Sequence, residues 1–271
     1  MKPEITVQLY SVREQAKADY EGTIRAIFAM GFNNVEPAGF PGSTVAKAAE
    51  LFKELGLKAP SCHGPLPVGE NKNQIIDDAL TLGHKYIFTG CPANFQADFK
   101  TESTVKAAAE RYCEAAVFAA KHGLQVGYHN HDWDLLPING RPGYQIFLDN
   151  TPDTVLFEAD LFWVARAGLD PVKFIQEIGT RGKVLHFKDG VASADGTFTE
   201  AETVDGKIMV SSATPFLPAG TGQVNLKGSA KAAKYAEYIA VELDSYTGDM
   251  MKAVQQSYTF LTTSGIARGR I

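Results

Sequence analysis

Two periods of hydrophobic residues alternate along the chain. Short apolar runs such as residues 5–11 are typical of buried strands, and most are followed by a segment with the spacing of an amphipathic helix. In residues 20–31, for example, Ile24, Ile27 and Phe28 share one helical face, and the segment ends at a glycine. The pattern predicts strands at residues 5–11, 34–37, 57–63, 86–89, the first part of 124–134, 154–160, 183–189 and 238–244. It predicts helices at 20–31, 43–55, 74–82, 103–122, 144–148, 171–178, 226–236 and 249–262.

Eight strands that alternate with helices predict an α/β fold, a closed (β/α)8 TIM barrel. An open doubly wound sheet is the alternative, but it usually needs fewer strands. No GxGxxG or GxxxxGK[ST] motif follows the first strand, which argues against a dinucleotide or P-loop site. We expect a single domain over residues 1–271, with a long irregular loop at about 190–224 after the seventh strand. Loops of that length are usually functional or disordered.

Composition narrows the class of protein. Of 271 residues, 45% are hydrophobic and 21% are charged, which is ordinary for a globular protein with a sizeable core. The net charge is −5 and no Lys/Arg-rich run occurs, so we expect no nucleic-acid partner. No apolar run is long enough for a membrane span and no signal peptide is recognisable, which favours a cytoplasmic protein. The three cysteines are widely spaced and form no CxxC, which argues against a disulfide framework or a thiolate metal site.

Ionisable residues gather at the predicted carboxyl ends of six of the eight strands. In TIM barrels these ends carry the active site. A ring of structural salt bridges is the alternative, but acids are depleted in strands and are costly to bury singly. The set consists of Glu36, His63, His129 with His131 and Asp134, Glu158 with Asp160, His186 with Lys188, and Glu242 with Asp244.

The stretch 127–134 holds two histidines and two acids. Alternation along an extended chain places His129 and His131 on one face and Asn130 on the other. A polar strand end with satisfied hydrogen bonds is the alternative to a metal site. At the barrel rim as a whole, a mixed set of one imidazole and several carboxylates suits a divalent ion, namely Mn²⁺, Mg²⁺, Co²⁺ or Zn²⁺.

Several motifs, taken in order, resemble the sugar phosphate isomerase/epimerase family, the xylose-isomerase-like TIM barrels. The resemblance covers essentially the whole chain, and its strength lies in the combination because no single motif is decisive. The motifs are QLYSVR at 8–13, VE at 35–36, YHNHDWD at 128–134, EADLFWVARAGLDP at 158–171, LHFKD at 185–189 and VELD at 241–244.

The resemblance implies one divalent metal ion, held by an acid after strand five, an Asp after strand six, a His in strand seven and a Glu in strand eight. Asp160, His186 and Glu242 take the last three places. The first falls on Asp134, where the family usually carries Glu. Because Asp is one methylene shorter, its carboxylate could miss the metal ion or bind it through water. The ion could then be held by three protein ligands, with His131 or water assisting.

The remaining rim residues have more than one interpretation. Glu242 and Asp134 are candidate acid and base, and Lys188 is a third candidate catalytic residue that could bind substrate oxygens. A salt bridge from Lys188 to Glu158 or Glu242 is the structural alternative. Candidate substrate contacts that could instead be structural are His131, His63, Glu36, Trp133 and Trp163.

These features predict a metal-dependent isomerase or epimerase of a sugar or keto-sugar-like small molecule. Such an enzyme transfers a proton next to a carbonyl through an enediolate. A lyase or dehydratase acting on a keto-sugar or inosose at the same site is one alternative. A non-catalytic sugar-binding barrel is another, and a homo-oligomer is left open.

Overall fold

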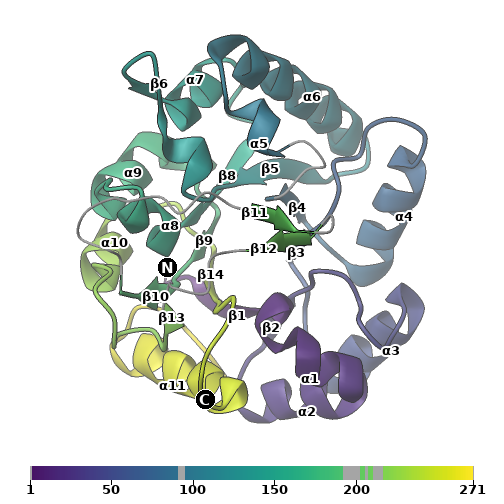
Figure 1. Ribbon diagram of the computed structural model, residues 1–271. Helices are drawn as coiled ribbons and strands as arrows, with labels where there is room; N and C mark the ends of the chain where they lie inside the picture. The colour runs from purple at the N-terminus through teal and green to yellow at the C-terminus, as the bar shows by residue number, and fades with distance from the viewer. Residues whose placement is uncertain (1, 91–94, 192–201, 205–206, 210–215, 271) are drawn as a thin grey trace.

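Eight parallel strands form a barrel surrounded by helices (Figure 1). The computed structural model describes residues 2–90, 95–191, 202–204, 207–209 and 216–270. Hydrogen-bonded neighbours follow the order β2-β1-β14-β9-β8-β5-β4-β3. The two end strands are joined through Lys58, whose backbone N–H and C=O pair with Asn33 and Val35 at 2.9 Å each. The predicted α/β barrel is therefore confirmed. Its strands are β1 (Glu4–Gln8), β2 (Asn34–Glu36), β3 (Ser61–His63), β4 (Tyr86–Thr89), β5 (Gln125–His129), β8 (Leu156–Asp160), β9 (Val184–His186) and β14 (Tyr238–Val241).

The helices form the outer ring seen in Figure 1. Each predicted helix has a counterpart: α2 (Tyr20–Ala29), α3 (Val45–Leu55), α4 (Lys72–Leu82), α6 (Glu102–Ala120), α7 (Gly143–Asp149), α9 (Pro171–Ile178), α10 (Leu226–Ala232) and α11 (Met250–Thr263). Three further short helices were not expected: α1 (Arg13–Ala18), α5 (Phe95–Asp98) and α8 (Leu161–Arg166). No helix among the described residues is both long and apolar enough to cross a membrane.

The first strand is shorter than predicted, and this has a local cause. The prediction ran to residue 11, but β1 ends at Gln8 and a 3-10 turn, η1 (Leu9–Val12), follows. The Gln8 side chain accepts a hydrogen bond from the Tyr10 backbone N–H at 3.1 Å, which turns the chain out of the sheet. The same side chain donates to Glu36 at 2.8 Å. A polar residue with neighbours on two sides therefore ends the strand.

Two layers fill the barrel interior. The layer towards the amino-terminal ends of the strands is a small apolar plug of Tyr86, Phe88, Leu156 and Val184. This plug is separate from the main core between the barrel and the helices. A Cβ at Gly127 would lie 2.5 Å from the Phe88 ring, so the glycine makes room for the plug. Because alternate strand residues share a face, positions two and four residues beyond the plug also point inward. The inward-facing series are thus Leu156, Glu158 and Asp160 on one strand, and Val184, His186 and Lys188 on the next.

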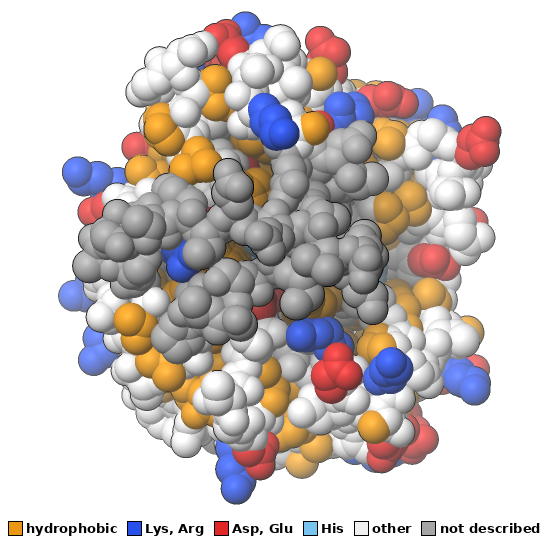
Figure 2. Space-filling view, in the orientation of Figure 1, with side chains coloured by type: hydrophobic (Ala, Val, Ile, Leu, Met, Phe, Trp, Pro, Cys, Tyr) orange, Lys and Arg blue, Asp and Glu red, His pale blue; other side chains and the backbone are white. Residues whose placement is uncertain are grey.

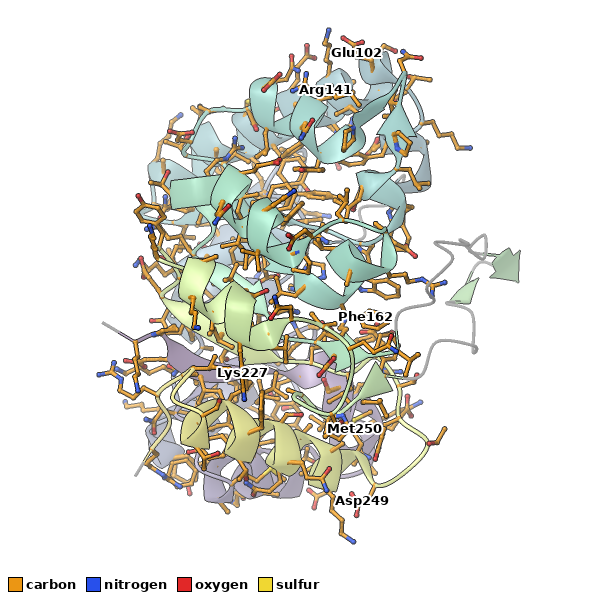
Figure 3. The ribbon with its side chains drawn as sticks, turned by 90° about the vertical axis from the view of Figure 1, so that its left-hand side faces the viewer. Glu102, Arg141, Phe162, Lys227, Asp249 and Met250 are labelled. Carbon is orange, nitrogen blue, oxygen red and sulfur yellow. The ribbon has the colours of Figure 1, made fainter. Side chains whose placement is uncertain are left out.

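The segment at 190–224 contains short strand pairs where an irregular loop was expected. The pairs are β10 (Asp189–Gly190) with β13 (Phe216–Leu217), and β11 (Glu202–Val204) with β12 (Lys207–Met209). Residues 192–201, 205–206 and 210–215 lie outside the described part of the chain. In Figure 3 the β11–β12 hairpin projects from the end of the barrel at which Phe162 is labelled. A second hairpin, β6 (Pro137–Ile138) with β7 (Arg141–Pro142), follows β5.

Candidate metal centre and active site

The carboxyl-terminal half of the barrel interior is lined by buried ionisable groups. Glu36, Glu158, Asp160 and His186 have no exposed surface, and Glu242 is only 5% exposed. They occupy inward-facing positions immediately above the apolar plug, at the ends of their strands. This arrangement is consistent with the prediction that the strand ends bring these groups together. Burial on this scale requires that the charges be compensated, because an isolated buried carboxylate is very costly.

One group of four side chains has the composition of a metal site. His129, Asp160, His186 and Glu242 each offer a ligand atom, and these atoms lie within 4.8 Å of one another. They come from β5, β8 and β9 and from the residue directly after β14, which are four adjacent strands of the barrel. Two imidazoles and two carboxylates suit a divalent ion such as zinc.

A second possible donor group lies beside the first. It consists of His63, His129, Glu158 and His186, and it shares two histidines with the first group. Glu158 Oε2 lies 2.6 Å from His63 Nε2 and 2.9 Å from His129 Nδ1. Its other oxygen, Oε1, is buried and lies 3.4 Å from His186 Nε2. Sequence reasoning placed Glu158 at the rim but did not predict this contact with two histidines.

His186 is held between two carboxylates. Its Nδ1 lies 2.7 Å from Glu242 Oε2, and its Nε2 lies 2.8 Å from Glu36 Oε1. Glu36 also accepts from Gln8 and from the Ser61 hydroxyl. Burial would raise the pKa of Glu36, but His186 and the other neighbours outweigh burial and lower that pKa to about 2. Burial opposes the charged imidazole, yet the surrounding glutamates raise the pKa of His186 well above its usual value.

Lys188 neutralises part of the acidic cluster. Its Nζ lies 2.9 Å from Asp160 Oδ2, 2.9 Å from Glu242 Oε2 and 2.8 Å from Asp244 Oδ1. The side chain is buried, which disfavours its charge, but the three carboxylates raise the pKa of Lys188 well above normal. The pairing with Glu242 agrees with one of the two expected salt bridges. The pairing with Glu158 is not among the ion pairs of the described residues.

Asp134 lies outside both donor groups. It belongs to the 3-10 turn η2 (Trp133–Leu135), beyond the end of β5, and it is fully buried. Its Oδ2 accepts hydrogen bonds from the Tyr128 hydroxyl and from the backbone N–H of His131, the latter at 2.9 Å. Burial raises the pKa of Asp134 well above the usual range. His129, within the strand, belongs to the donor group in which the resemblance had led us to expect Asp134, and the role of Asp134 as a ligand or base stays a prediction.

Asp160 is oriented by its neighbours on both sides. Its Oδ1 caps α8 by accepting from the backbone N–H groups of Phe162 and Trp163 at 3.0 and 3.2 Å. Asn130 accepts from the Asp160 N–H at 2.9 Å and donates to the Asp160 carbonyl at 3.3 Å. Sequence reasoning missed this role of Asn130, although alternation had placed it on the face opposite the histidines. The other carboxylate oxygen, Oδ2, is left on the side of Lys188.

An aromatic wall lies beside the cluster. The His131 ring stacks on Trp133 with centroids 4.2 Å apart, and it lies 5.8 Å from the Trp163 ring. Lys188 Nζ lies 5.4 Å from the Trp163 ring centroid and 5.5 Å from that of Phe216 on β13. Trp163 is 2% exposed, and its indole N–H has no hydrogen-bonding partner among the described residues. The wall therefore combines flat apolar faces with an available donor, as sugar-binding sites often do.

The comparisons with known proteins agree with this architecture. No protein-family model and no curated protein matches the chain. Among solved structures, a sugar phosphate isomerase/epimerase from Parabacteroides distasonis is 20% identical, with a TM-score of 0.76 over 98% of this chain and 100% of that one. The probable 3-DHS dehydratase AsbF from Bacillus anthracis is 16% identical, with a TM-score of 0.72 over 96% and 98%. The IolI protein with a bound zinc atom is 15% identical, with a TM-score of 0.70 over 98% of each chain. As the resemblance predicted, the chain has the fold of the sugar phosphate isomerase/epimerase and xylose-isomerase-like TIM barrels.

Proposed function

We propose that this protein is a divalent-metal-dependent isomerase or epimerase that moves a proton next to the carbonyl of a sugar-like compound. The observation that carries the proposal is the buried group of His129, Asp160, His186 and Glu242 at the end of the barrel where active sites lie. The similar fold of a zinc-containing structure and of a sugar phosphate isomerase/epimerase supports it. A bound divalent ion would polarise the substrate carbonyl and stabilise the negative charge that develops on its oxygen.

Glu242 is the candidate base. Burial alone would raise the pKa of Glu242, but Lys188 and His186 outweigh burial and hold that pKa well below its usual range. Glu242 is therefore a carboxylate at neutral pH and can accept a proton from carbon. Its Oε2 is hydrogen-bonded to His186 Nδ1 at 2.7 Å and lies 2.9 Å from Lys188 Nζ, so the carboxylate is also held in a fixed position.

Glu158 is the candidate acid. It lies near the Nε2 side of His186, whereas Glu242 contacts Nδ1, so the imidazole separates the two carboxyl groups. Burial, and next the nearby Glu36, raise the pKa of Glu158. Two carboxyl groups whose pKa values are displaced in opposite directions are typical of an acid and base pair. Trp163 and Trp133 would cover the sugar ring and exclude water.

A lyase or dehydratase is the second candidate. The dehydratase AsbF has the same fold with a TM-score of 0.72, and its reaction class can use the same first step. Loss of a proton next to a carbonyl leads to isomerisation if the proton returns at another carbon. It leads to elimination if a neighbouring hydroxyl leaves as water. Product analysis distinguishes the two.

Proton exchange in D₂O tests the proposal. The metal-loaded protein is incubated with a panel of keto-sugars, and loss of the proton next to the carbonyl is followed by NMR. We expect exchange with at least one compound and a loss of about 10²- to 10⁴-fold in Glu242→Gln, because the change removes the base and also one of the four candidate metal donors. Glu237→Gln, the same change at the opposite end of the barrel, serves as the matched control. Exchange that survives in Glu242→Gln would contradict the assignment, and no exchange with any compound would favour a non-catalytic sugar-binding barrel.

A further inference from the structure

A buried carboxylate occupies a nest of backbone N–H groups beside the site. Asp189, next to Lys188, is 1% exposed. Its Oδ1 accepts from the backbone N–H groups of Gly190 at 2.8 Å and Val224 at 3.1 Å. Its Oδ2 accepts from those of Gly220 at 2.9 Å and Gly222 at 3.0 Å. Four backbone donors thus converge on one internal anion.

This nest stands where TIM barrels commonly bind phosphate. The loops after strands seven and eight frequently supply backbone N–H groups to a phosphate, and converging N–H groups form anion-binding concavities. Here the loop after β9, the seventh strand of the barrel in chain order, supplies the donors, but the chain's own carboxylate takes them. A Cβ added at Gly222 would collide with Asp189 and with the Gly190 nitrogen, so the nest has no room for a second anion.

The N-termini of the neighbouring helices are likewise capped by side chains of the protein itself. Each helix that follows the last three barrel strands has its first N–H groups bound by a side chain of its own N-cap. The caps are Asp160 on α8, Asp170 on α9, Asn225 on α10 and Asp249 on α11. Three of these four caps are carboxylates, which would also repel a bound phosphate.

The charge around the cluster also argues against a bound phosphate. The ammonium of Lys188 contacts three carboxylates, and Glu36 and Glu158 add two more buried acids nearby. From residue 189 to 226 the sequence contains one Lys or Arg, Lys207. On the face drawn in Figure 2, the coloured Lys and Arg side chains are scattered rather than gathered at one place. A phosphate dianion would be repelled there by the acidic majority.

We infer that the substrate of the proposed isomerase or epimerase is an unphosphorylated polyhydroxy keto compound, a free sugar or cyclitol. The inference rests on the proposed function. Asp244, whose side chain is 18% exposed, is the most accessible carboxylate around Lys188 and accepts hydrogen bonds from substrate hydroxyls. An uncharged polyol supplies such donors without adding negative charge. The Trp163 indole N–H then donates to a substrate oxygen.

Matched pairs of a free ketose and its terminal phosphate test the inference. We would use fructose with fructose 6-phosphate and ribulose with ribulose 5-phosphate on the metal-loaded protein. Binding is measured by saturation-transfer NMR and exchange is measured in D₂O. We expect the free ketose of at least one pair to bind at least tenfold more tightly than its ester. Tighter binding of the ester would overturn the inference whether or not exchange occurs.

The two measurements separate the inference from the proposed function. A free ketose that binds in preference but does not exchange would contradict the enzyme and leave the substrate class supported. Binding of neither member of any pair would overturn both.

Asp189→Ala empties the nest, so we expect the affinity for the ester relative to the ketose to rise at least tenfold. Asp77→Ala, at an exposed position of α4, is the matched control. If Asp189→Ala does not fold, the wild-type comparison of the pairs still decides.

Discussion

The two ends of the barrel interior are built from the same strands but have opposite chemistry. Towards the amino-terminal end, Phe88 and Leu156 belong to a plug of apolar and aromatic side chains. Two and four residues further along β8 the inward positions hold Glu158 and Asp160, both fully buried. At the outer edge of the plug, a partly exposed set of charges surrounds Glu237. Along β8, a spacing of two residues therefore separates the stabilising apolar core from the cluster of ionisable groups.

The difference is the one expected between a stabilising core and a candidate functional site. Burying apolar side chains stabilises the folded state, whereas burying charges costs free energy that paired charges offset only in part. The carboxyl-terminal end keeps at least five buried acids near one lysine, which a protein selected for stability alone would not need. Such clusters occur at functional sites, where a ligand or metal ion completes the charge balance. The following changes test this division of roles.

The largest stability effect is expected in the plug. Phe88→Ala removes a fully buried ring beside Gly127 and leaves a cavity, so we expect a loss of about 3–5 kcal/mol in the free energy of unfolding. Urea denaturation measures the change. Val117→Ala, at a 65% exposed position, is the control and should change stability by less than about 0.5 kcal/mol. Loss of metal binding from chains that remain folded would show that the two ends are not independent.

A smaller and pH-dependent effect is expected at the edge of the plug. Glu237 lies 2.6 Å from Lys85 Nζ and accepts from the Tyr86 hydroxyl at 2.8 Å. Burial opposes its charge, but Lys85, Tyr86 and Lys183 lower the pKa of Glu237 overall. A lowered pKa in the folded state stabilises the protein above the unfolded-state pKa of about 4.3, and this stabilisation is lost as the pH falls.

Glu237→Gln tests that pH dependence. The amide oxygen can still accept from Tyr86, so the change removes mainly the charge. Because the pair is partly exposed, we expect a loss of only about 0.2–1 kcal/mol at pH 7. Denaturation at several pH values should show the difference from wild type shrinking below about pH 4.3. A difference that grows as the pH falls would contradict this assignment.

Most of the fold could be predicted from the sequence, because strand and helix periods are local and repeat regularly. Strand ends were less predictable, since β1 stops where the Gln8 side chain bonds the Tyr10 N–H, a contact that periodicity does not encode. The new strands β10 and β13 pair across about 25 residues of chain and depend on tertiary structure. The local sequence pattern therefore predicts most strands and helices, whereas side-chain contacts set the residues at which they end.

The site was predicted at the level of strand ends but not of individual contacts. Asp160, His186 and Glu242 lie at predicted strand ends and were assigned as ligands by the resemblance, and the structure brings them into one group. The resemblance assigned the remaining acid to Asp134, at a place where the family usually carries Glu. The turn after β5 instead directs that carboxylate to Tyr128 and to the His131 N–H. Alternation had placed His129 and His131 on one face of the strand, and of these two it is His129 that lies in the donor group.

The central claim is that His129, and not Asp134, completes the metal site, and the metal content of two variants tests it most directly. Wild type, His129→Ala and Asp134→Asn are purified in the same metal-containing buffer, checked for folding by circular dichroism, and analysed for bound elements. We expect about one divalent ion per wild-type chain, a loss of at least tenfold in affinity in His129→Ala, and near-normal content in Asp134→Asn. The reverse result, with metal kept in His129→Ala and lost in folded Asp134→Asn, would contradict the proposed site.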